Sequence, residues 1–401
     1  LNMGETHIKD SVVFRFEKPE HMAYFIDSVN ISANFSETIL HSNELSQFAP
    51  ELKNFNDRIE LSGYFKGTVT SFYADNFNLK LGDHTNLEGS IEIDGLPKIN
   101  DALFSIDLYN SSIKATDFQK HLPERPFQIS NKLGLIKLDG RFDGFIKDFV
   151  ANGNFETEIG NFNSNTNLEI TDNDIATYNG RLSMNNFDIG YFIEDSLYQN
   201  MNMIGSIQGS GFTLENADFL LEANISSVGI NGYEYNDIVT DGRFAQSFFS
   251  GDMTVDDSNF ILSASGSVDL RAKDNTLNIE GTFLKANLDE LNISSEDMMI
   301  ASDFKLDFTG IQLDSIEGAI QLRNSYVKYL DEDLIIDSLF FSAKREEDRR
   351  SVNVLSNFFD IDLVGDYEFS TILDELTSLN EQYKLIFSSK QDEVKDFLLN
   401  R

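Results

Sequence analysis

Three clusters of acidic residues come nearest to catalytic chemistry in this sequence. Two carboxylates held a short distance apart can act as general acid and general base, for example on a glycosidic bond. With 67 acidic residues in 401, however, such clusters arise from composition alone, and each falls between segments that we expect to be strands. We therefore predict solvated turns at these places. The clusters are Asp172 with Asp174, Asp256 with Asp257, and Asp331 with Glu332 and Asp333.

Metal and cofactor sites are not indicated. The segment from Asp172 to Asp174 lacks the turn glycine and distal glutamate of an EF-hand calcium loop. Cysteine is absent, and no phosphate-binding glycine loop or nucleophile elbow occurs. The histidines are far apart and none pairs at metal-ligand spacing; they are His7, His21, His41, His84 and His121. We expect no catalytic residue, no metal and no cofactor, and so a protein that is not an enzyme.

The elements that the chain does specify are strands, and a glycine-containing motif recurs among them. Four copies occur: Leu61, Gly63, Phe65 and Gly67; Leu138, Gly140, Phe142 and Gly144; Ile204, Gly205, Ile207 and Gly209; and, more loosely, Leu306, Phe308 and Gly310. The intervals of roughly 65 to 100 residues are too long for leucine-rich, ankyrin or propeller repeats. We interpret the copies as modules of one repeat protein.

Glycine inside a strand marks a bulge, a sharp bend or a close approach of two backbones. Gly140 and Gly144 share a strand face with Leu138 and Phe142, so large side chains alternate with empty positions on that face. We predict that Gly63, Gly67, Gly140, Gly144, Gly205, Gly209 and Gly310 are bends that curl the sheet toward its apolar side.

Apolar residues alternate with acidic or amide residues along many segments, which is typical of an antiparallel sheet with one wet face. We expect the apolar positions to form the floor of a groove. They are Phe65, Ile91, Ile93, Phe104, Ile106, Leu108, Leu138, Phe142, Phe155, Leu168, Ile170, Ile207, Leu277, Ile279, Phe283, Phe304, Leu306 and Phe308.

Composition supports this interpretation. The 31 lysines and arginines against 67 acidic residues give a formal net charge of −36, which repels phosphate backbones and excludes nucleic acid as a partner. The 35 phenylalanines need an apolar environment. Lys344, Arg345, Arg349 and Arg350 form the single basic run, which is interleaved with acidic residues and predicts a charged hairpin tip.

Helices are expected to be few and short. Apolar residues three or four apart precede the glycine strands at Leu45 and Phe48, Phe118 and Leu122, Ile189 and Phe192, and Leu288 and Leu291. A longer helical pattern begins at Thr371. We predict one continuous β-trough over residues 1–370, with repeats at about 40–115, 116–188, 189–287 and 288–370, and a helical cap or segment over 371–401.

The order of these motifs resembles the Bacteroidota branch of the TamB family, the translocation and assembly module proteins of the AsmA-like superfamily. The resemblance spans about residues 40–310 and extends more faintly to Phe369. It is carried by Leu45, Phe48 and Pro50, by the first two glycine motifs, by Asp94, Gly95 and Pro97, by Thr116, Phe118, Leu122 and Pro123, and by Asn185, Phe187 and Ile189.

The resemblance implies an all-β fold: an elongated repeat of antiparallel strands curled into an open trough, or β-taco. It also implies a middle segment of a periplasmic protein whose inner-membrane anchor lies outside this chain. The expected function is a bridge-like conduit for phospholipid acyl chains that supports outer-membrane biogenesis. The expected partners are phospholipids and an Omp85-type outer-membrane barrel similar to TamA or TamL.

Two other functions remain open from the sequence. The first is a scaffold or chaperone for outer-membrane protein assembly and secretion, which would use free sheet edges to template strands. The second is a surface β-solenoid adhesin, which predicts a core filled by side chains and ladders of aromatic or carboxylate residues outside. The cross-section of the sheet distinguishes a groove from a filled core.

Overall fold

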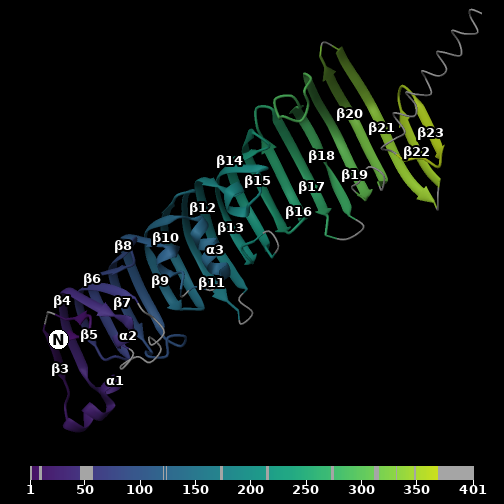
Figure 1. Cartoon of the computed structure of the whole chain (residues 1–401). Coiled ribbons are helices and arrows are strands. Elements are labelled where there is room, and N and C mark those ends of the chain that lie inside the picture. Colours follow the sequence, from purple (N-terminus) through teal and green to yellow (C-terminus); the bar gives the residue numbers. More distant parts are fainter. Residues whose placement is uncertain are drawn as a thin grey trace, which may run out of the picture. The chain divides into compact units, whose positions relative to one another are not determined.

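The structure is a computed structural model that describes residues 2–8, 11–45, 57–120, 122, 124–171, 175–213, 216–271, 275–310, 316–330, 332–346 and 349–368. It is nearly all β (Figure 1). The chain divides into two compact units, which we treat separately: unit 1 is Leu1–Gln246 with Met253–Ser258, and unit 2 is Ser247–Asp252 with Asn259–Arg401. The predicted helical segment over 371–401 lies outside the described residues.

Unit 1 is an antiparallel sheet in which strands pair in chain order from β3 to β15, while β2 pairs with β4 and β1 pairs with β2. Its strands are β1 (Asn2–Met3), β2 (Thr6–His7), β3 (Val12–Arg15), β4 (Asn30–His41), β5 (Arg58–Gly67), β6 (Ser71–Leu81), β7 (Thr85–Asp94), β8 (Leu103–Lys114), β9 (Leu135–Phe145), β10 (Asp148–Thr157), β11 (Gly160–Ile170), β12 (Ala176–Asp188), β13 (Tyr198–Ser210), β14 (Asp218–Ile230) and β15 (Tyr233–Ala245).

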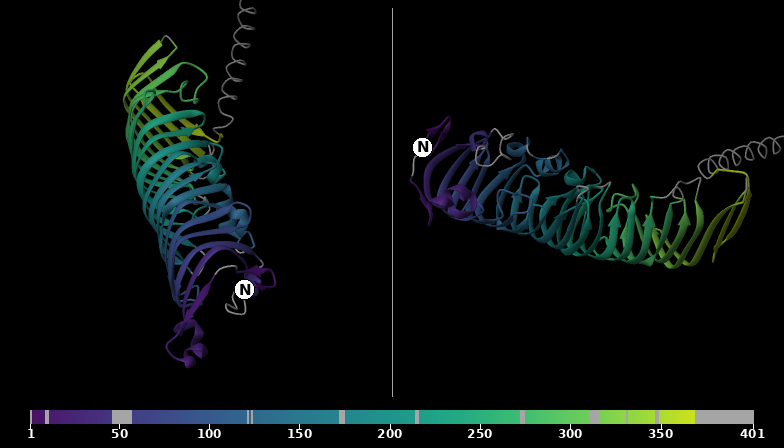
Figure 2. Two further views of the ribbon diagram at one scale, coloured as in Figure 1. Left: turned by 90° about the vertical axis from the view of Figure 1, so that its left-hand side faces the viewer. Right: turned by 90° about the horizontal axis from the view of Figure 1, so that it is seen from below.

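Unit 2 repeats the same plan, with antiparallel pairing in chain order from β17 to β23. Its strands are β17 (Phe260–Asp269), β18 (Thr276–Asn287), β19 (Met298–Thr309), β20 (Glu317–Tyr329), β21 (Glu332–Glu346), β22 (Arg349–Ser356) and β23 (Asp360–Gly365); β16 (Phe248–Asp256) is divided between the two units. Within each unit the strands are bent and the sheet stays open, so that it forms a trough (Figure 2). The predicted fold class is confirmed.

Period-two alternation explains why these segments are strands. In β10 exposed and half-buried residues alternate at every position, with Phe149 and Phe155 on one face and Asn152 and Asn154 on the other. A strand with one apolar face is stable only when its neighbours extend that face, and pairing in chain order achieves this. The result is a sheet with one apolar and one polar face.

Bulges interrupt this regularity in both units. Two residues of one strand face a single residue of its neighbour at Ser36 with Glu37, Asn76 with Phe77, Tyr109 with Asn110, Asn185 with Asn186, Leu284 with Lys285, and Asn324 with Ser325. Four of these residues, Asn76, Asn110, Asn186 and Asn324, have φ between 48° and 52°, a left-handed conformation that asparagine tolerates.

Each of these bulges has a buried side chain beside it. At each one, the inward side chain that completes or follows the bulge is almost fully buried: Thr38 (1% exposed), Phe77 (5%), Ser111 (2%), Phe187 (3%), Ala286 (4%) and Ser325 (1%). A bulge bends its strand and increases its twist. We conclude that the strands bend at these bulges and that the residue on the inner side of each bend is the one removed from water.

The described helices all belong to unit 1: η1 (Pro19–Tyr24), α1 (Phe25–Ser28), α2 (Ser42–Leu45), η3 (Ala115–Phe118), α3 (Glu124–Lys132) and α4 (Ile189–Ile193). Of the predicted helical turns, Phe118 lies in η3, and Ile189 and Phe192 lie in α4. Residues 288–291 of unit 2 form a turn in which the Leu291 N–H donates to Asn287, and Leu291 is buried. Phe48 lies outside the described residues.

Candidate functional site: the apolar face of the sheet

The strand register brings the predicted groove residues of unit 1 onto one face of its sheet. Cross-strand partners share a face, and the pairs connect Phe65 through Ala74 to Ile91 and on to Ile106, Phe142 and Ala151. We call this face the apolar face of unit 1. The other predicted residues of this unit also lie on it: Ile93, Phe104, Leu108, Leu138, Phe155, Leu168, Ile170 and Ile207.

Unit 2 has an apolar face of its own, built in the same way. Leu277 pairs with Phe308, Ile279 with Leu306, and Phe304 lies opposite Gly281. Phe283, the remaining predicted residue, shares their face on β18. From Phe308 the face continues through Gly318, Ala343 and Val352 to Leu363. Within each unit, the residues predicted from the sequence therefore lie on a common face.

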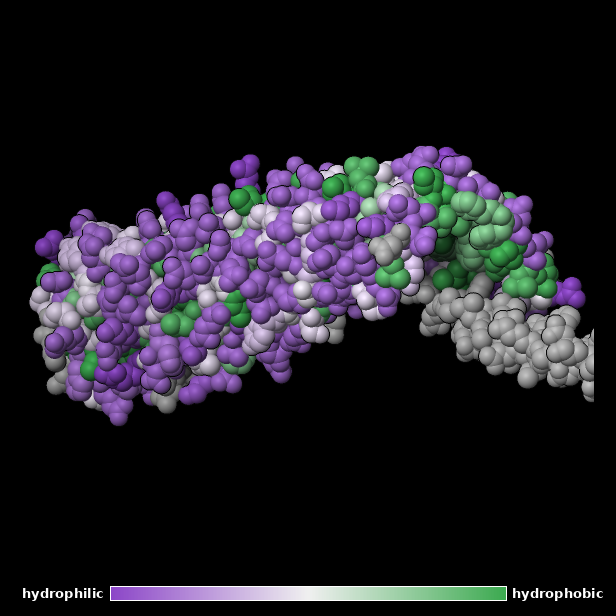
Figure 3. All heavy atoms as spheres, turned by 90° about the horizontal axis from the view of Figure 1, so that it is seen from above, coloured by the Kyte–Doolittle hydropathy of each residue, from purple (hydrophilic) through white to green (hydrophobic). Residues whose placement is uncertain are grey.

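Most of these side chains are only half-buried. Of the eighteen predicted groove residues, Ile93 and Phe304 are buried at 7% exposure, while the rest keep intermediate exposure. In Figure 3 apolar side chains gather in the hollow of unit 2. The side of unit 1 that this view shows is mainly hydrophilic. The side chains of the apolar face therefore keep surface that an apolar ligand can contact.

Phenylalanine rings line much of this face. In unit 1 the rings of Phe142 and Phe149 stack with centroids 4.4 Å apart, and those of Phe155 and Phe162 with centroids 4.7 Å apart. Phe219 stacks on Phe244 at 5.6 Å. In unit 2 Phe283 stacks on Phe304 at 4.5 Å. The stacked pairs make these parts of the floor aromatic and uncharged.

The glycines of the repeated motif lie on the apolar face beside these rings. Gly67 pairs with Phe72, Gly144 with Phe149, and Gly209 with Phe219. A Cβ added to Gly144 would come within 2.4 Å of the Asp148 carbonyl oxygen, and one added to Gly209 within 2.4 Å of the Asp218 carbonyl oxygen. An aromatic ring covering a cross-strand glycine is a known stabilising pair in sheets. These glycines permit close approach of two strands.

The other motif glycines fall into two groups. Gly63, Gly140 and Gly205 also approach neighbouring backbone too closely for a Cβ, and Gly63 lies opposite the Asn76 bulge. Gly310 differs, because it follows the end of β19 with φ 78° and its N–H donates to the Asn275 carbonyl. The position that pairs with Phe308 on the apolar face is instead Gly318. The fourth motif copy is therefore not equivalent to the first three.

Some residues of the apolar face were not among the predictions. Phe149, Phe162, Phe219 and Phe244 lie on it, and their positions in alternating segments were the signal that could have identified them. The face also carries hydroxyl groups. Those of Ser164 and Thr166 on β11 hydrogen bond to each other at 3.0 Å, so these polar atoms are satisfied within the floor.

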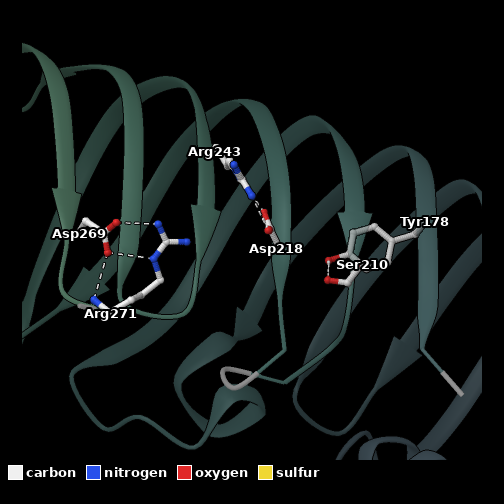
Figure 4. A network of polar contacts seen from close by, with 6 residues as sticks. All are labelled: Tyr178, Ser210, Asp218, Arg243, Asp269 and Arg271. Carbon is white, nitrogen blue, oxygen red and sulfur yellow. Dashed lines mark hydrogen bonds and ion pairs between the residues drawn. The ribbon is translucent and has the colours of Figure 1, made fainter. Parts of the chain in front are cut away.

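Two arginine–aspartate pairs lie on the opposite face, one in each unit. Arg243 forms two hydrogen bonds with the Asp218 carboxylate, at 2.8 and 2.6 Å, and in unit 2 Arg271 does the same with Asp269 at 2.9 and 2.7 Å (Figure 4). The Arg271 hydrogen bonds lower the pKa of Asp269 to about 2. Such exposed pairs contribute little stability, and they keep this face hydrated.

Tyr178 lies on the apolar face of unit 1 near its edge. Its hydroxyl donates to the Gly211 carbonyl at 2.9 Å. The same hydroxyl lies 3.4 Å from the Ser210 carbonyl (Figure 4). Its ring stacks on Phe212 with centroids 5.1 Å apart. Burial, followed by the charge of Asp218, raises the pKa of Tyr178 to about 12. The phenol is therefore held neutral.

The acidic clusters do not assemble a catalytic pair in the part of the chain that the structure describes. Asp257 is buried, and its carboxylate accepts hydrogen bonds from the Tyr233 hydroxyl and from the backbone and side chain of Asn236. The prediction of a solvated turn is wrong there, because these donors replace water around the carboxylate. Asp333 accepts a hydrogen bond from the Tyr326 hydroxyl at 2.6 Å. Asp172, Asp174 and Asp331 lie outside the described residues.

No group of three or more potential ligands lies close enough to hold a metal ion within the described ranges. A search of the same ranges finds no helix with the length and hydropathy to cross a membrane. Comparison with protein-family models, with curated proteins and with solved structures finds nothing that matches this chain.

Proposed function

We propose that this chain is a periplasmic conduit that carries the acyl chains of phospholipids along its apolar face, between the inner and the outer membrane. The observation that supports this most directly is the half-buried apolar face, which each unit carries across its strands. Phenylalanine and aliphatic residues line it, and the Arg243–Asp218 and Arg271–Asp269 pairs lie on the opposite face. The order of the motifs, which resembles the TamB family, supports the same proposal.

Acyl chains gain about 0.8 kcal/mol for each CH₂ group removed from water. On a floor of stacked phenylalanines and aliphatic side chains this gain is similar from one strand to the next, so a chain slides with little barrier. The open side of each trough leaves the polar headgroup in water. These features support transport more than storage, which needs one site that binds better than its neighbours.

Partners and location follow from the resemblance and belong to the same proposal. An Omp85-type barrel would receive the lipid at the outer membrane, and an inner-membrane anchor would tether the protein. The open sheet argues against a β-solenoid adhesin, whose core is filled by side chains. The proposed role in outer-membrane biogenesis requires that lipid contacts the apolar face in cells.

Photo-crosslinking tests the proposal. A photoreactive amino acid at Phe142, Ile170 or Ile279 is expected to capture phospholipid in cells, whereas the same group at Asn163, on the opposite face of β11, is expected to capture little. The Phe142→Arg substitution places a charge on the floor and should impair the outer-membrane barrier. Val150→Arg, on the polar face of the adjacent strand, is the matched control. Equal crosslinking from both faces would refute the proposal.

A further inference from the structure

Two arginines lie on the apolar face of unit 2 at the end of the hairpin between β21 and β22. Arg345 and Arg350 are direct cross-strand partners, and the next inward pair on the same face is Ala343 with Val352. The apolar floor therefore ends at two guanidinium groups. Arg349, although adjacent in sequence, pairs with Glu346 on the opposite face.

Arg350 is unusual for a charged residue because it is only 5% exposed. A buried charge is costly unless it is paired and hydrogen bonded. Its Nη2 donates to the carboxylate of Glu368, whose side chain is 51% exposed. Glu368 follows β23 and belongs to no strand, so the cation lies in the sheet while the carboxylate lies outside it.

The pairing of two arginines favours an anion beside them. Like charges directly opposite each other in a sheet are destabilising, and an anion near both relieves the repulsion. Guanidinium groups bind carboxylate and phosphate through two parallel hydrogen bonds, and phosphate suits this geometry well. The net charge of −36 disfavours anionic ligands over most of the chain, whereas Arg345 and Arg350 place two cations side by side on one face.

Next to the arginines, the floor offers a place for an aliphatic tail. Val352 pairs with Leu363, and Val354 lies between Phe341 and Ile361 on the same face. Ile361 is 48% exposed and Val352 is buried. A molecule with its tail on these residues would bring an anionic headgroup to Arg350 and Arg345.

We propose that Arg350 and Arg345 form a headgroup site for an anionic amphiphile, in which a phosphate displaces the Glu368 carboxylate while the tail lies on the apolar face of β21 to β23. This inference rests on the proposed function, because it assigns the headgroup chemistry of the lipid that the trough carries. A carboxylate headgroup, as in a fatty acid, shares this chemistry, and the experiment separates the two.

Binding to the full chain is measured with three probes that have the same tail: dodecyl phosphate, dodecanoate and the neutral dodecyl maltoside. We expect dodecyl phosphate to bind about tenfold or more tightly than dodecyl maltoside, a factor that corresponds to one charge-assisted hydrogen bond. Arg350→Gln should abolish this preference. Arg349→Gln, which removes the same charge from the polar face of the same hairpin, should preserve it.

Glu368→Gln gives the opposite result, because it removes the competing carboxylate and should tighten dodecyl phosphate binding severalfold. If the Arg350→Gln variant does not fold, Arg350→Met combined with Glu368→Gln removes both charges of the pair and serves in its place. Tighter binding of dodecyl phosphate than of dodecanoate assigns the site to a phosphate headgroup, and the reverse order assigns it to a fatty acid.

Two negative results have different meanings. If all three probes bind equally well and Arg350→Gln changes nothing, the headgroup site is wrong while the acyl-chain groove stands. If no probe binds the apolar face at all, the proposed function itself fails.

Discussion

Replacing Gly144 by alanine is expected to destabilise the β9–β10 hairpin locally. Gly144 has φ 139°, a conformation almost restricted to glycine, and the added Cβ would lie 2.4 Å from the Asp148 carbonyl oxygen and 2.7 Å from the Phe149 Cα. Backbone strain of this kind costs about 1–3 kcal/mol. Overpacking against backbone, which cannot move aside like a side-chain end, adds about 1–3 kcal/mol. The expected total is about 2–6 kcal/mol.

The measurement is amide hydrogen exchange of peptides from β9 and β10. A repeat sheet opens locally, so a global unfolding curve would average the effect over strands that are not disturbed. At the lower limit of about 2 kcal/mol, exchange of the hydrogen-bonded amides in this hairpin should accelerate roughly 30-fold. Peptides from β5 and β6, which do not contact Gly144, should change little.

Gly365→Ala is the control. A Cβ at Gly365 would make only ordinary contacts, 3.4 and 3.8 Å from the Tyr367 ring, and its φ is not in the left-handed region. That substitution should change protection of β22 and β23 by no more than about 0.5 kcal/mol. If Gly144→Ala leaves protection of β9 and β10 as unchanged as the control does, close strand approach is not the reason for glycine at this position.

Three further outcomes are expected. Asn110→Val should destabilise β8 by about 1–3 kcal/mol because a β-branched residue tolerates φ 49° poorly, whereas Asn110→Gly should cost far less. If both variants lose the same protection of β8 amides in hydrogen exchange, the bulge conformation is not the cause. Tyr178→Phe should lower local stability by about 1 kcal/mol through loss of the hydrogen bond to Gly211. Because its folded pKa of about 12 exceeds the unfolded value of roughly 10, the stabilisation by Tyr178 is complete below about pH 10 and is lost as the pH rises through 12. A chemical-shift titration of the Tyr178 ring checks this, and a midpoint near pH 10 would contradict it.

The sequence by itself determined the class of the fold and the composition of the apolar face. Alternation is a local property, because neighbouring side chains on a strand point to opposite faces whatever the strand pairs with. Phe142, Ile170 and Ile279 could therefore be assigned to a common kind of face before any pairing was known. The motif glycines beside phenylalanine were detectable for the same reason, since both residue types follow the same period of two.

Only the tertiary structure decided where the strands bend and which residues meet across them. The bulges at Asn110 and Asn324 depend on how each strand is paired with its neighbour. The alternation within a single strand does not indicate this pairing. Burial of Asp257 depends on Tyr233 and Asn236, which are more than 20 positions away. Arg345 and Arg350 share a face because of the register of one hairpin, and a shift of a single residue would separate them.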